Sequence, residues 1–507
     1  MVDRRWRRAL VLGAFAVSAL LVAACTSTAP ISSLRPSLPG PGVGGSADRP
    51  NIVFVLTDDL SWNLVRFMPQ VREMEHEGVT FSRYFVTDSL CCPSRSSIFT
   101  GDYPHDTGVI MNTGPNGGFR AFLRNGDERR TFALRLRRSG YRTAILGKYL
   151  NGYPTEMRVR GEQPYRDPGW SLFGAADVHG YREYGFHITD NRSVDYYGFA
   201  PRDYMTSVLA RKAHRFISSS AAAHKPFLLE VATFAPHRPF VPAPQDVGKF
   251  PNLSAPRTPA FGKAIRNAPR WMHGIGPLNP GNIRTINQFY RLRAESVLAV
   301  DRMLGSLRRQ LDSLGIARNT YVIFSSDNGF HMGEHDLRPG KQTAFDTDIR
   351  VPLVLVGPGV PSGRVVKALA ENIDLCPTFE RLGGTTPLPT VDGRSLVPLI
   401  HGHVPRNWRT AVLIEHHGPD TNTFDPDFQY KDAGNPPSYE AIRTAHALYV
   451  QYVTGGREFY NLRTDPYELD NRVATMSPVL RNRLRRTLLA MEQCHGERAC
   501  WAAQHLR

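Results

Sequence analysis

The hydrophobic pattern of the chain is dominated by short apolar runs that end in clusters of polar residues. Residues 51–56, NIVFVL, form one such run and lead directly into the sequence TDD. Residues 320–324, TYVIF, end in the same way, in the sequence SSDNG. Continuous apolar runs of this length, rich in β-branched residues, are typical of strands buried on both faces of a sheet. Further candidate strands occupy residues 143–146, 227–231 and 352–356.

Helical patterns lie between these runs, most clearly over residues 128–138 and 288–314. Strands that alternate with helices predict a doubly wound α/β sheet. Ligands of such sheets bind beyond the carboxyl ends of the strands. Because both acidic clusters follow predicted strands, we expect a functional site at this edge of the sheet.

The pattern changes after about residue 405. Residues 439–453 and 457–462 predict antiparallel strands around a Gly-Gly pair, and residues 478–492 predict a helix. We therefore expect a main domain over residues 49–405 and a smaller α+β domain over residues 406–507, packed on the first.

The N-terminus is typical of an export signal. A basic segment precedes an apolar run over residues 9–24, which at 16 residues is short for a membrane span of about 20 residues. The sequence Val22-Ala23-Ala24-Cys25 resembles a bacterial lipobox, in which the cysteine becomes the lipidated N-terminus; a plain signal peptide with an incidental cysteine is the alternative. This predicts a signal peptide over residues 1–24 and a Ser-, Pro- and Gly-rich tether over residues 25–48. The expected location is the bacterial cell envelope, on the outer face of the cytoplasmic membrane, with the lipid as anchor.

Charge and cysteine content fit an exported protein. The formal net charge is +16, which suits an anionic substrate or the envelope, although a solvated arginine-rich surface is the commoner explanation of such a charge. No nucleic-acid-binding motif accompanies the charge, so no nucleic-acid partner is expected. Of the six cysteines, Cys494 and Cys500 lie close enough in sequence to close a small disulfide loop.

Four hard oxygen donors follow the two strands: Asp58 and Asp59 after the first, and Asp327 and Asn328 after the second. If the strands are neighbours, these donors converge, and three carboxylates repel one another without a cation. Oxygen donors of this kind favour Ca²⁺ or Mg²⁺, whereas zinc prefers nitrogen and sulfur. Taken alone, each acidic cluster is also ordinary loop chemistry.

A second motif carries chemistry, the stretch SLCCPSRSSIFTG from residue 89 to residue 101. Pro93 suits the first position of a helix, which places two cysteines at a helix N-terminus, where the dipole favours a thiolate. A soft thiolate is nevertheless a poor partner for a hard, oxygen-bound cation. If Cys91 lies beside the metal, its side chain should be harder than sulfur.

The sequence Cys91-Cys92-Pro93-Ser94-Arg95, with Thr100-Gly101 downstream, resembles the C-x-P-S-R…T-G signature of type I sulfatases. In that family the first cysteine is oxidised to formylglycine by a formylglycine-generating enzyme, and the hydrated aldehyde supplies an oxygen nucleophile beside calcium. The resemblance implies that Cys91 is converted, because proline and arginine follow it by two and four positions. Cys92 then occupies the variable position.

The resemblance extends over nearly the whole chain from Arg49 and implies an alkaline-phosphatase-like fold with one Ca²⁺ per chain. It implies five metal positions: Asp58, Asp59, Cys91 after conversion, Asp327 and Asn328. It also implies catalytic roles for Cys91 as nucleophile, Arg95 in positioning it, Lys148 and Lys341 in balancing charge, and His237 or Lys341 in assisting departure of the alcohol.

The motifs CCPSRSS and GKYLN are most similar to N-acetylglucosamine-6-sulfatases, which implies a sulfated carbohydrate or an aryl sulfate as substrate. One departure concerns the Lys-x-His motif of arylsulfatases. Here Lys148 is followed by Tyr149 and Leu150, and then by Asn151, so the residue that replaces this histidine is left open. Two alternatives remain: a formylglycine-dependent phosphonate monoester or phosphodiester hydrolase, and a non-catalytic glycan-binding surface lipoprotein.

Several aromatic and histidine residues have two interpretations. His331 and His335 are expected to be solvated loop residues rather than site residues, and His105 is ambiguous. The aromatic segment 179–191 either lines a sugar site or packs on the domain surface, and packing is the expectation.

Overall fold

The computed structural model describes residues 49–154, 164–191 and 193–506. The predicted signal peptide, Cys25 and the tether lie outside these residues. All of the described residues belong to one compact unit, and the domain boundary at residue 405 stays a prediction.

Within the described residues, the main sheet has eight strands, and only β10 runs antiparallel to its neighbours. This confirms the doubly wound mixed sheet. β10 starts after Pro352, which has no N–H to donate to the sheet. In spatial order the strands are β11 (Arg364–Val366), β2 (Val79–Phe81), β10 (Leu353–Val356), β9 (Thr320–Ser326), β1 (Asn51–Thr57), β8 (Phe227–Ala232), β4 (Arg142–Gly147) and β5 (Leu172–Ala175). Two small sheets pair β3 (Tyr84–Phe85) with β12 (Ala370–Glu371) and β6 (Phe186–Asp190) with β7 (Ser193–Tyr197).

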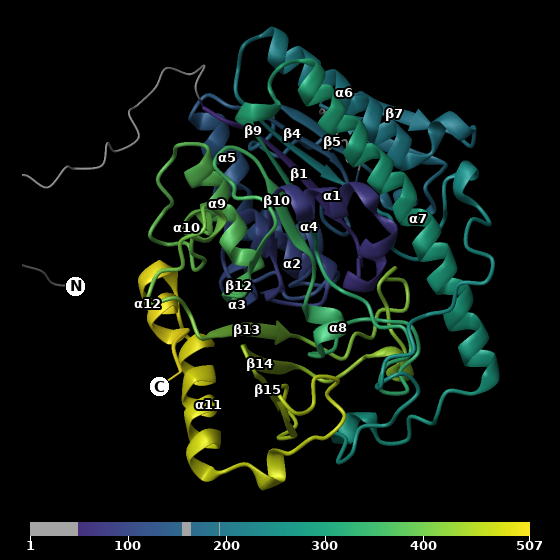
Figure 1. Ribbon diagram of the computed structural model, residues 1–507, viewed down its shortest axis with the longest axis vertical. Coiled ribbons are helices and arrows are strands. Elements are labelled where there is room, and N and C mark those ends of the chain that lie inside the picture. Colours follow the sequence, from purple (N-terminus) through teal and green to yellow (C-terminus); the bar gives the residue numbers. More distant parts are fainter. Residues whose placement is uncertain (1–48, 155–163, 192, 507) are drawn as a thin grey trace, which may run out of the picture. The chain divides into compact units, whose positions relative to one another are not determined.

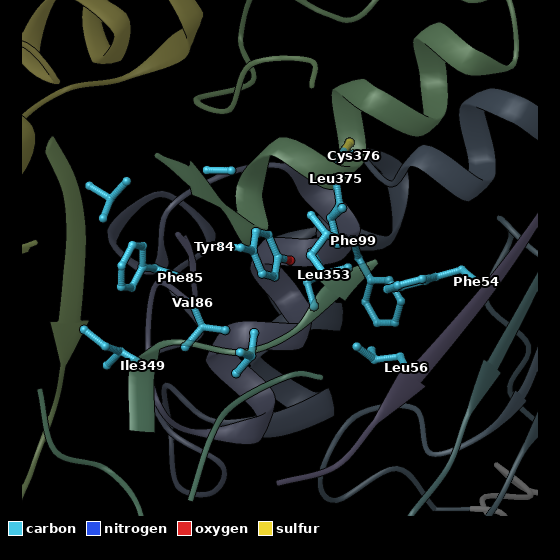
Figure 2. Packing of buried hydrophobic residues seen from close by; sticks show 14 of the residues in the cluster. Phe54, Leu56, Tyr84, Phe85, Val86, Phe99, Ile349, Leu353, Leu375 and Cys376 are labelled. Atoms are coloured by element: carbon cyan, nitrogen blue, oxygen red, sulfur yellow. The ribbon is translucent and has the colours of Figure 1, made fainter. Parts of the chain in front are cut away.

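Helices cover both faces of this sheet (Figure 1). Alternate residues of β1 point to opposite faces: Phe54 belongs to one buried core, and Val53 and Val55 belong to the other. The first face packs against α2 (Cys91–Thr100), α4 (Gly118–Asn125), α5 (Phe132–Arg138) and α9 (Leu375–Leu382). The second face packs against α1 (Pro69–Glu77), α6 (Met205–Ala222) and α7 (Pro280–Ser313). Figure 2 shows part of the first core, including Phe54 and Phe99.

Both predicted long helices differ from the observed ones at their N-terminal ends. α7 begins eight residues before the predicted start at residue 288, because Asn279 forms a capping box with Asn282 and Pro280 occupies the first turn. The predicted helix 128–138 is instead a short 3₁₀ turn, Asp127–Arg129, followed by α5, which Thr131 caps. Caps and not hydrophobic spacing therefore set these boundaries.

The C-terminal segment forms a four-stranded antiparallel sheet with helices beside it, as the pattern after residue 405 predicts (Figure 1). The disulfide between Cys494 and Cys500 is present. The strands are β13 (Ala411–His416), β14 (Tyr439–Thr444), β15 (Ala447–Tyr452) and β16 (Arg457–Asn461), and the helices are α11 (Pro478–Met491) and α12 (Gly496–Ala503). Three short helices complete the described fold: α3 (Pro104–Thr107), α8 (Asp346–Ile349) and α10 (Val397–Ile400).

Candidate active site

The four predicted oxygen donors meet at the carboxyl end of the sheet. β1 and β9 are parallel neighbours, with Thr57 opposite Ser326, so the residues that follow each strand lie side by side. The Asp59 amide donates to Asp327 Oδ1 at 3.2 Å, and Asn328 Nδ2 lies 2.6 Å from Asp59 Oδ1. All of these side chains are buried.

Their electrostatics fit a divalent cation. Burial, reinforced by the neighbouring Asp58 carboxylate, raises the pKa of Asp327 to about 6 even though Arg95 opposes the shift. A cation among these oxygens would relieve that repulsion, and the set of carboxylates and one amide matches the hard-donor preference of Ca²⁺ or Mg²⁺. The backbone of Asp59 has a left-handed conformation, with φ of 64°. Residues other than glycine rarely adopt this conformation, and those that do are often found at functional sites.

Cys91 lies beside these donors, at the first residue of α2. Its Sγ is 3.3 Å from Asp58 Oδ1 and 3.6 Å from Asn328 Oδ1. The expectation that Pro93 starts the helix is wrong: Leu90 is the extended N-cap residue, and both cysteines belong to the first turn. The geometric consequence, a cysteine at a helix N-terminus facing the oxygen donors, holds.

An unmodified Cys91 would be a poor nucleophile here. Burial raises its pKa well above the usual value, and the carboxylates of Asp427 and Asp58 raise it further, despite two nearby lysines. The side chain is therefore a neutral thiol at ordinary pH, not the thiolate that the helix dipole alone favours.

The predicted catalytic residues Arg95 and Lys148 each form an ion pair with a carboxylate of the candidate metal site. Arg95 Nε lies 2.7 Å from Asp327 Oδ2, and Lys148 Nζ lies 2.5 Å from Asp58 Oδ2. Burial alone would raise the pKa of Asp58, but the surrounding cations, Lys148 first, outweigh it and lower the pKa to about 2. Lys148 follows Gly147, where a Cβ would lie 2.0 Å from a carbonyl oxygen of β8, so only glycine permits this close approach of the strands.

Lys341 reaches the centre of the site from the loop after β9. Its Nζ donates to Asp59 Oδ1 at 2.7 Å and lies 3.0 Å from Cys91 Sγ. Burial would lower the pKa of this amine, but the carboxylates of Asp427 and Asp59 raise it well above its usual value. Lys341 is therefore a buried ammonium that contacts both the predicted metal ligands and the predicted nucleophile.

His237 completes the predicted set. Nδ1 lies 2.6 Å from the Arg238 carbonyl oxygen, and Nε2 lies 2.6 Å from Asp427 Oδ1 and 3.6 Å from Asp59 Oδ2. Burial would lower its pKa, but the carboxylates of Asp59, Asp58 and Asp427 raise it. A raised pKa favours the doubly protonated ring, in which Nδ1 donates to the Arg238 carbonyl oxygen and Nε2 donates to Asp427 on the side of the site.

Four further residues enter the site that the sequence did not assign to it. Asp427 accepts hydrogen bonds from Asn112 Nδ2 at 2.6 Å and from Asn151 Nδ2 at 3.0 Å, in addition to its contacts with the two cations. The ring of Tyr181 lies 4.9 Å from Lys148 Nζ. In the sequence, two of these residues had a weak signal. Asn151 follows the position where arylsulfatases have the histidine of their Lys-x-His motif, and Tyr181 belongs to the aromatic segment 179–191.

A cavity of about 460 Å³ opens beside Lys148 and Tyr181. Asn151, Phe424 and Asp425 belong to its lining. It is large enough for one or two sugar rings and lies beside the reactive centre. Part of the segment 179–191 therefore lines a pocket, contrary to the expectation that it only packs on the domain surface.

The expectation for the two loop histidines is wrong. Both His331 and His335 are buried. His331 Nδ1 lies 3.0 Å from both carboxylate oxygens of Asp348, and the His335 ring packs against Phe345 with ring centres 4.2 Å apart. These side chains hold the loop after β9 in place.

The doubly wound fold, with buried oxygen donors, cations and a cysteine at the carboxyl end of its sheet, fits a hydrolase whose site could bind a metal ion. The chain belongs to the sulfatase family: the family model "Sulfatase" matches residues 50–385, and the model "N-sulphoglucosamine sulphohydrolase, C-terminal" matches residues 333–493. The protein is therefore a sulfuric ester hydrolase.

Relatives agree with this assignment, and solved structures agree with the fold. Human N-acetylglucosamine-6-sulfatase is 33% identical over 483 residues, which cover 90% of this chain and 86% of the relative. The extracellular sulfatase SULF-1 homolog of Drosophila melanogaster is 33% identical over 73% of this chain and 33% of its own length. The fold is similar to a protein solved with its substrate D-glucosamine-2-N,6-O-disulfate, with a TM-score of 0.72 and 21% identity over 88% of this chain and 98% of that one. It is also similar to the phosphonate monoester hydrolase of Agrobacterium radiobacter, with a TM-score of 0.65 and 22% identity over 84% and 92% of the chains.

Proposed function

We propose that this sulfatase removes sulfate esters from sugars, with a formylglycine derived from Cys91 as nucleophile and one calcium ion. The observation that carries the proposal is the position of Cys91. Its Sγ lies 3.3 Å from the Asp58 carboxylate and 3.0 Å from the Lys341 ammonium, where a harder oxygen in its place would meet both metal and cation.

The formylglycine hydrate would supply an oxygen nucleophile and the calcium ion a Lewis acid for sulfate. Asp58, Asp59, Asp327 and Asn328 would hold the ion, with the converted side chain as a fifth ligand. Arg95 of α2 pairs with Asp327 and thereby holds that helix against the donors.

The remaining site residues act on the sulfate and on the alcohol. Lys148 and Lys341 offset the negative charge on the transferring group in a buried, preorganised setting. As the S–O bond breaks, its electron pair goes to the leaving oxygen, which takes a proton from His237 Nε2 or Lys341 Nζ. Tyr181 forms part of the wall between these groups and the cavity that would hold the sugar.

Conversion of Cys91 requires a formylglycine-generating enzyme as a partner. Cys91, Pro93 and Arg95 are fully buried in the folded protein. The converting enzyme would therefore act on the chain before α2 packs against the sheet.

The substrate proposal rests on the relatives, since human N-acetylglucosamine-6-sulfatase is similar over most of the chain. We expect sulfate release from 6-O-sulfated N-acetylglucosamine and from an activated aryl sulfate, and little turnover of an aryl phosphonate. The measurement is ion chromatography of released sulfate alongside a phosphonate assay with the same enzyme preparation. No release from a panel of sulfated sugars, together with efficient phosphonate hydrolysis, would favour the phosphonate hydrolase. No turnover of either ester would favour the glycan-binding lipoprotein.

Removal of the metal should abolish activity. We expect chelation to lower turnover of an aryl sulfate at least about 100-fold, because a bound ion would offset the charge of three buried carboxylates and would supply a Lewis acid for sulfate. Calcium should restore activity better than magnesium, since a donor set made largely of protein oxygens suits Ca²⁺, whereas Mg²⁺ usually keeps several of its waters. Full activity of metal-free protein, verified by elemental analysis, contradicts this prediction.

We also propose that lipidated Cys25 anchors the protein to the outer face of the cytoplasmic membrane. The support is the lipobox-like sequence before Cys25, and two relatives carry the name extracellular sulfatase. Within residues 49–154, 164–191 and 193–506, no helix combines the length and the apolarity needed to cross a bilayer. The Cys25→Ser variant should move from the membrane fraction to the soluble exported fraction. Unchanged membrane binding and processing would exclude the anchor.

A further inference from the structure

Asp427, in the loop between β13 and β14, is held by four side-chain donors that converge on its carboxylate. Oδ1 lies 2.5 Å from Lys341 Nζ and 2.6 Å from His237 Nε2. Oδ2 accepts from Asn112 Nδ2 at 2.6 Å and from Asn151 Nδ2 at 3.0 Å. Asp427 is fully buried, so these contacts act without competition from solvent. Two cations and two amides around a buried pair of oxygens form an oxyanion-binding arrangement.

The geometry differs from that of a carboxylate that orients a catalytic histidine. Such a carboxylate normally binds the ring nitrogen that faces away from the substrate. Here Nδ1 of His237 already contacts the Arg238 carbonyl oxygen, and Asp427 instead contacts Nε2, which faces the site. Lys341, the other contact of Asp427 Oδ1, also contacts Cys91 Sγ. Asp427 Oδ1 therefore occupies the point shared by the two groups that would assist departure of the alcohol.

We infer that Lys341, His237, Asn112 and Asn151 form the receptor for the oxygens of the sulfate ester, and that Asp427 is an internal anion which the substrate displaces. A carboxylate and a sulfate ester share their negative charge and a pair of closely spaced acceptor oxygens. Because two anions at one point repel, substrate and Asp427 exclude each other there. The inference rests on the proposed function only in placing a sulfate ester at this site.

Displacement requires a side-chain rotation and not a movement of the loop. The Asp427 amide donates to Asp425 Oδ1 at 2.9 Å, and its carbonyl oxygen accepts from Gln342 Nε2 at 3.2 Å and Gln429 Nε2 at 2.8 Å. These bonds fix the peptide on both sides. Asn151, which donates to the carboxylate, also lines the cavity together with Asp425 and Pro426, and this cavity would offer the carboxylate room when sulfate takes its place.

The test measures binding of inorganic sulfate to the calcium-loaded enzyme by titration calorimetry. Asp427→Ala and Asp427→Asn should each tighten sulfate binding, the alanine variant by about tenfold, because the competing charge is gone. KM for an aryl sulfate should fall in the same direction. Asp420→Asn is the matched control: it lies in the same loop, its Oδ1 accepts from the Asn422 amide, and an asparagine oxygen keeps that bond. Its sulfate affinity should equal that of the wild type.

A second pair of variants tests the receptor. In the Asp427→Ala background, adding Asn151→Ala should weaken sulfate binding about tenfold, because a buried donor to the anion is lost. Unchanged sulfate affinity in both Asp427 variants, with a loss of kcat at constant KM, would overturn the inference and make Asp427 a positioning residue for His237 and Lys341. Asp427→Asn preserves shape and supplies the same comparison if the alanine variant does not fold. Failure to hydrolyse sugar sulfates would overturn the proposed substrate and leave this sulfate-binding test intact.

Discussion

Replacement of Cys91 by alanine is expected to lower kcat/KM for an aryl sulfate by at least about 10⁴-fold, because it removes the group that attacks sulfur while the rest of the site stays in place. Cys91 lies at the first residue of α2, and alanine is a good helix former there. Thermal unfolding should therefore change little. The measurement is steady-state kinetics on protein whose metal content matches the wild type.

The neighbouring cysteine provides the control. Cys92 packs in the hydrophobic core, and its amide rather than its thiol contacts Asn112. Cys92→Ala should therefore cost about 1 kcal/mol of stability and leave turnover close to that of the wild type. Mass spectrometry of the tryptic peptide from Tyr84 to Arg95 should find formylglycine at Cys91 and an unmodified Cys92. An unmodified Cys91 in fully active protein would contradict the proposed nucleophile, and modification at Cys92 would contradict the assignment.

The metal donors were predictable because they depend on a local rule. Asp58 and Asp327 each follow an apolar run, and the carboxyl ends of parallel strands meet at one edge of a sheet. That prediction also assumed that β1 and β9 are neighbours. The sequence pattern does not report this pairing, because more than 250 residues separate the two strands. The signature around Cys91 connected the two acidic clusters with a reaction, because in proteins with this signature the modified cysteine lies beside the metal ion.

Asp427 had no comparable signal. It lies in an irregular loop with no periodic pattern, and its contacts with His237 and Lys341 span 190 and 86 positions in the chain. Nothing in the sequence TNTFDPDFQY separates it from ordinary loop chemistry. The burial of His331 was missed for a related reason: it depends on the Asp348 carboxylate from the short helix α8, and loop histidines are usually solvated. Long-range packing of loops determines both residues, and hydrophobic patterning does not report it.

Replacement of His237 by alanine is expected to damage turnover of a sugar sulfate far more than turnover of an activated aryl sulfate. A sugar alkoxide is a poor leaving group and needs a proton as the S–O bond breaks, whereas a nitrophenolate leaves without one. General acid catalysis typically contributes about 10²- to 10⁴-fold, so a loss of about 10³-fold on the sugar sulfate is expected, against about tenfold or less on the aryl sulfate.

The positions of the two candidate proton donors, His237 and Lys341, explain why the two substrates should respond differently. Both ring nitrogens of His237 face acceptors, Nδ1 the Arg238 carbonyl oxygen and Nε2 the Asp427 carboxylate, so the doubly protonated ring donates from both and can release its Nε2 proton toward the site. Lys341 Nζ is the other donor near the same point, since both contact Asp427 Oδ1. Lys341 also pairs with Asp59 and lies beside Cys91, so Lys341→Ala should impair both substrates and serves as the contrast. Equal losses on both substrates in His237→Ala would show that His237 binds sulfate without protonating the alcohol, and Lys341 would then be the remaining donor for the leaving group.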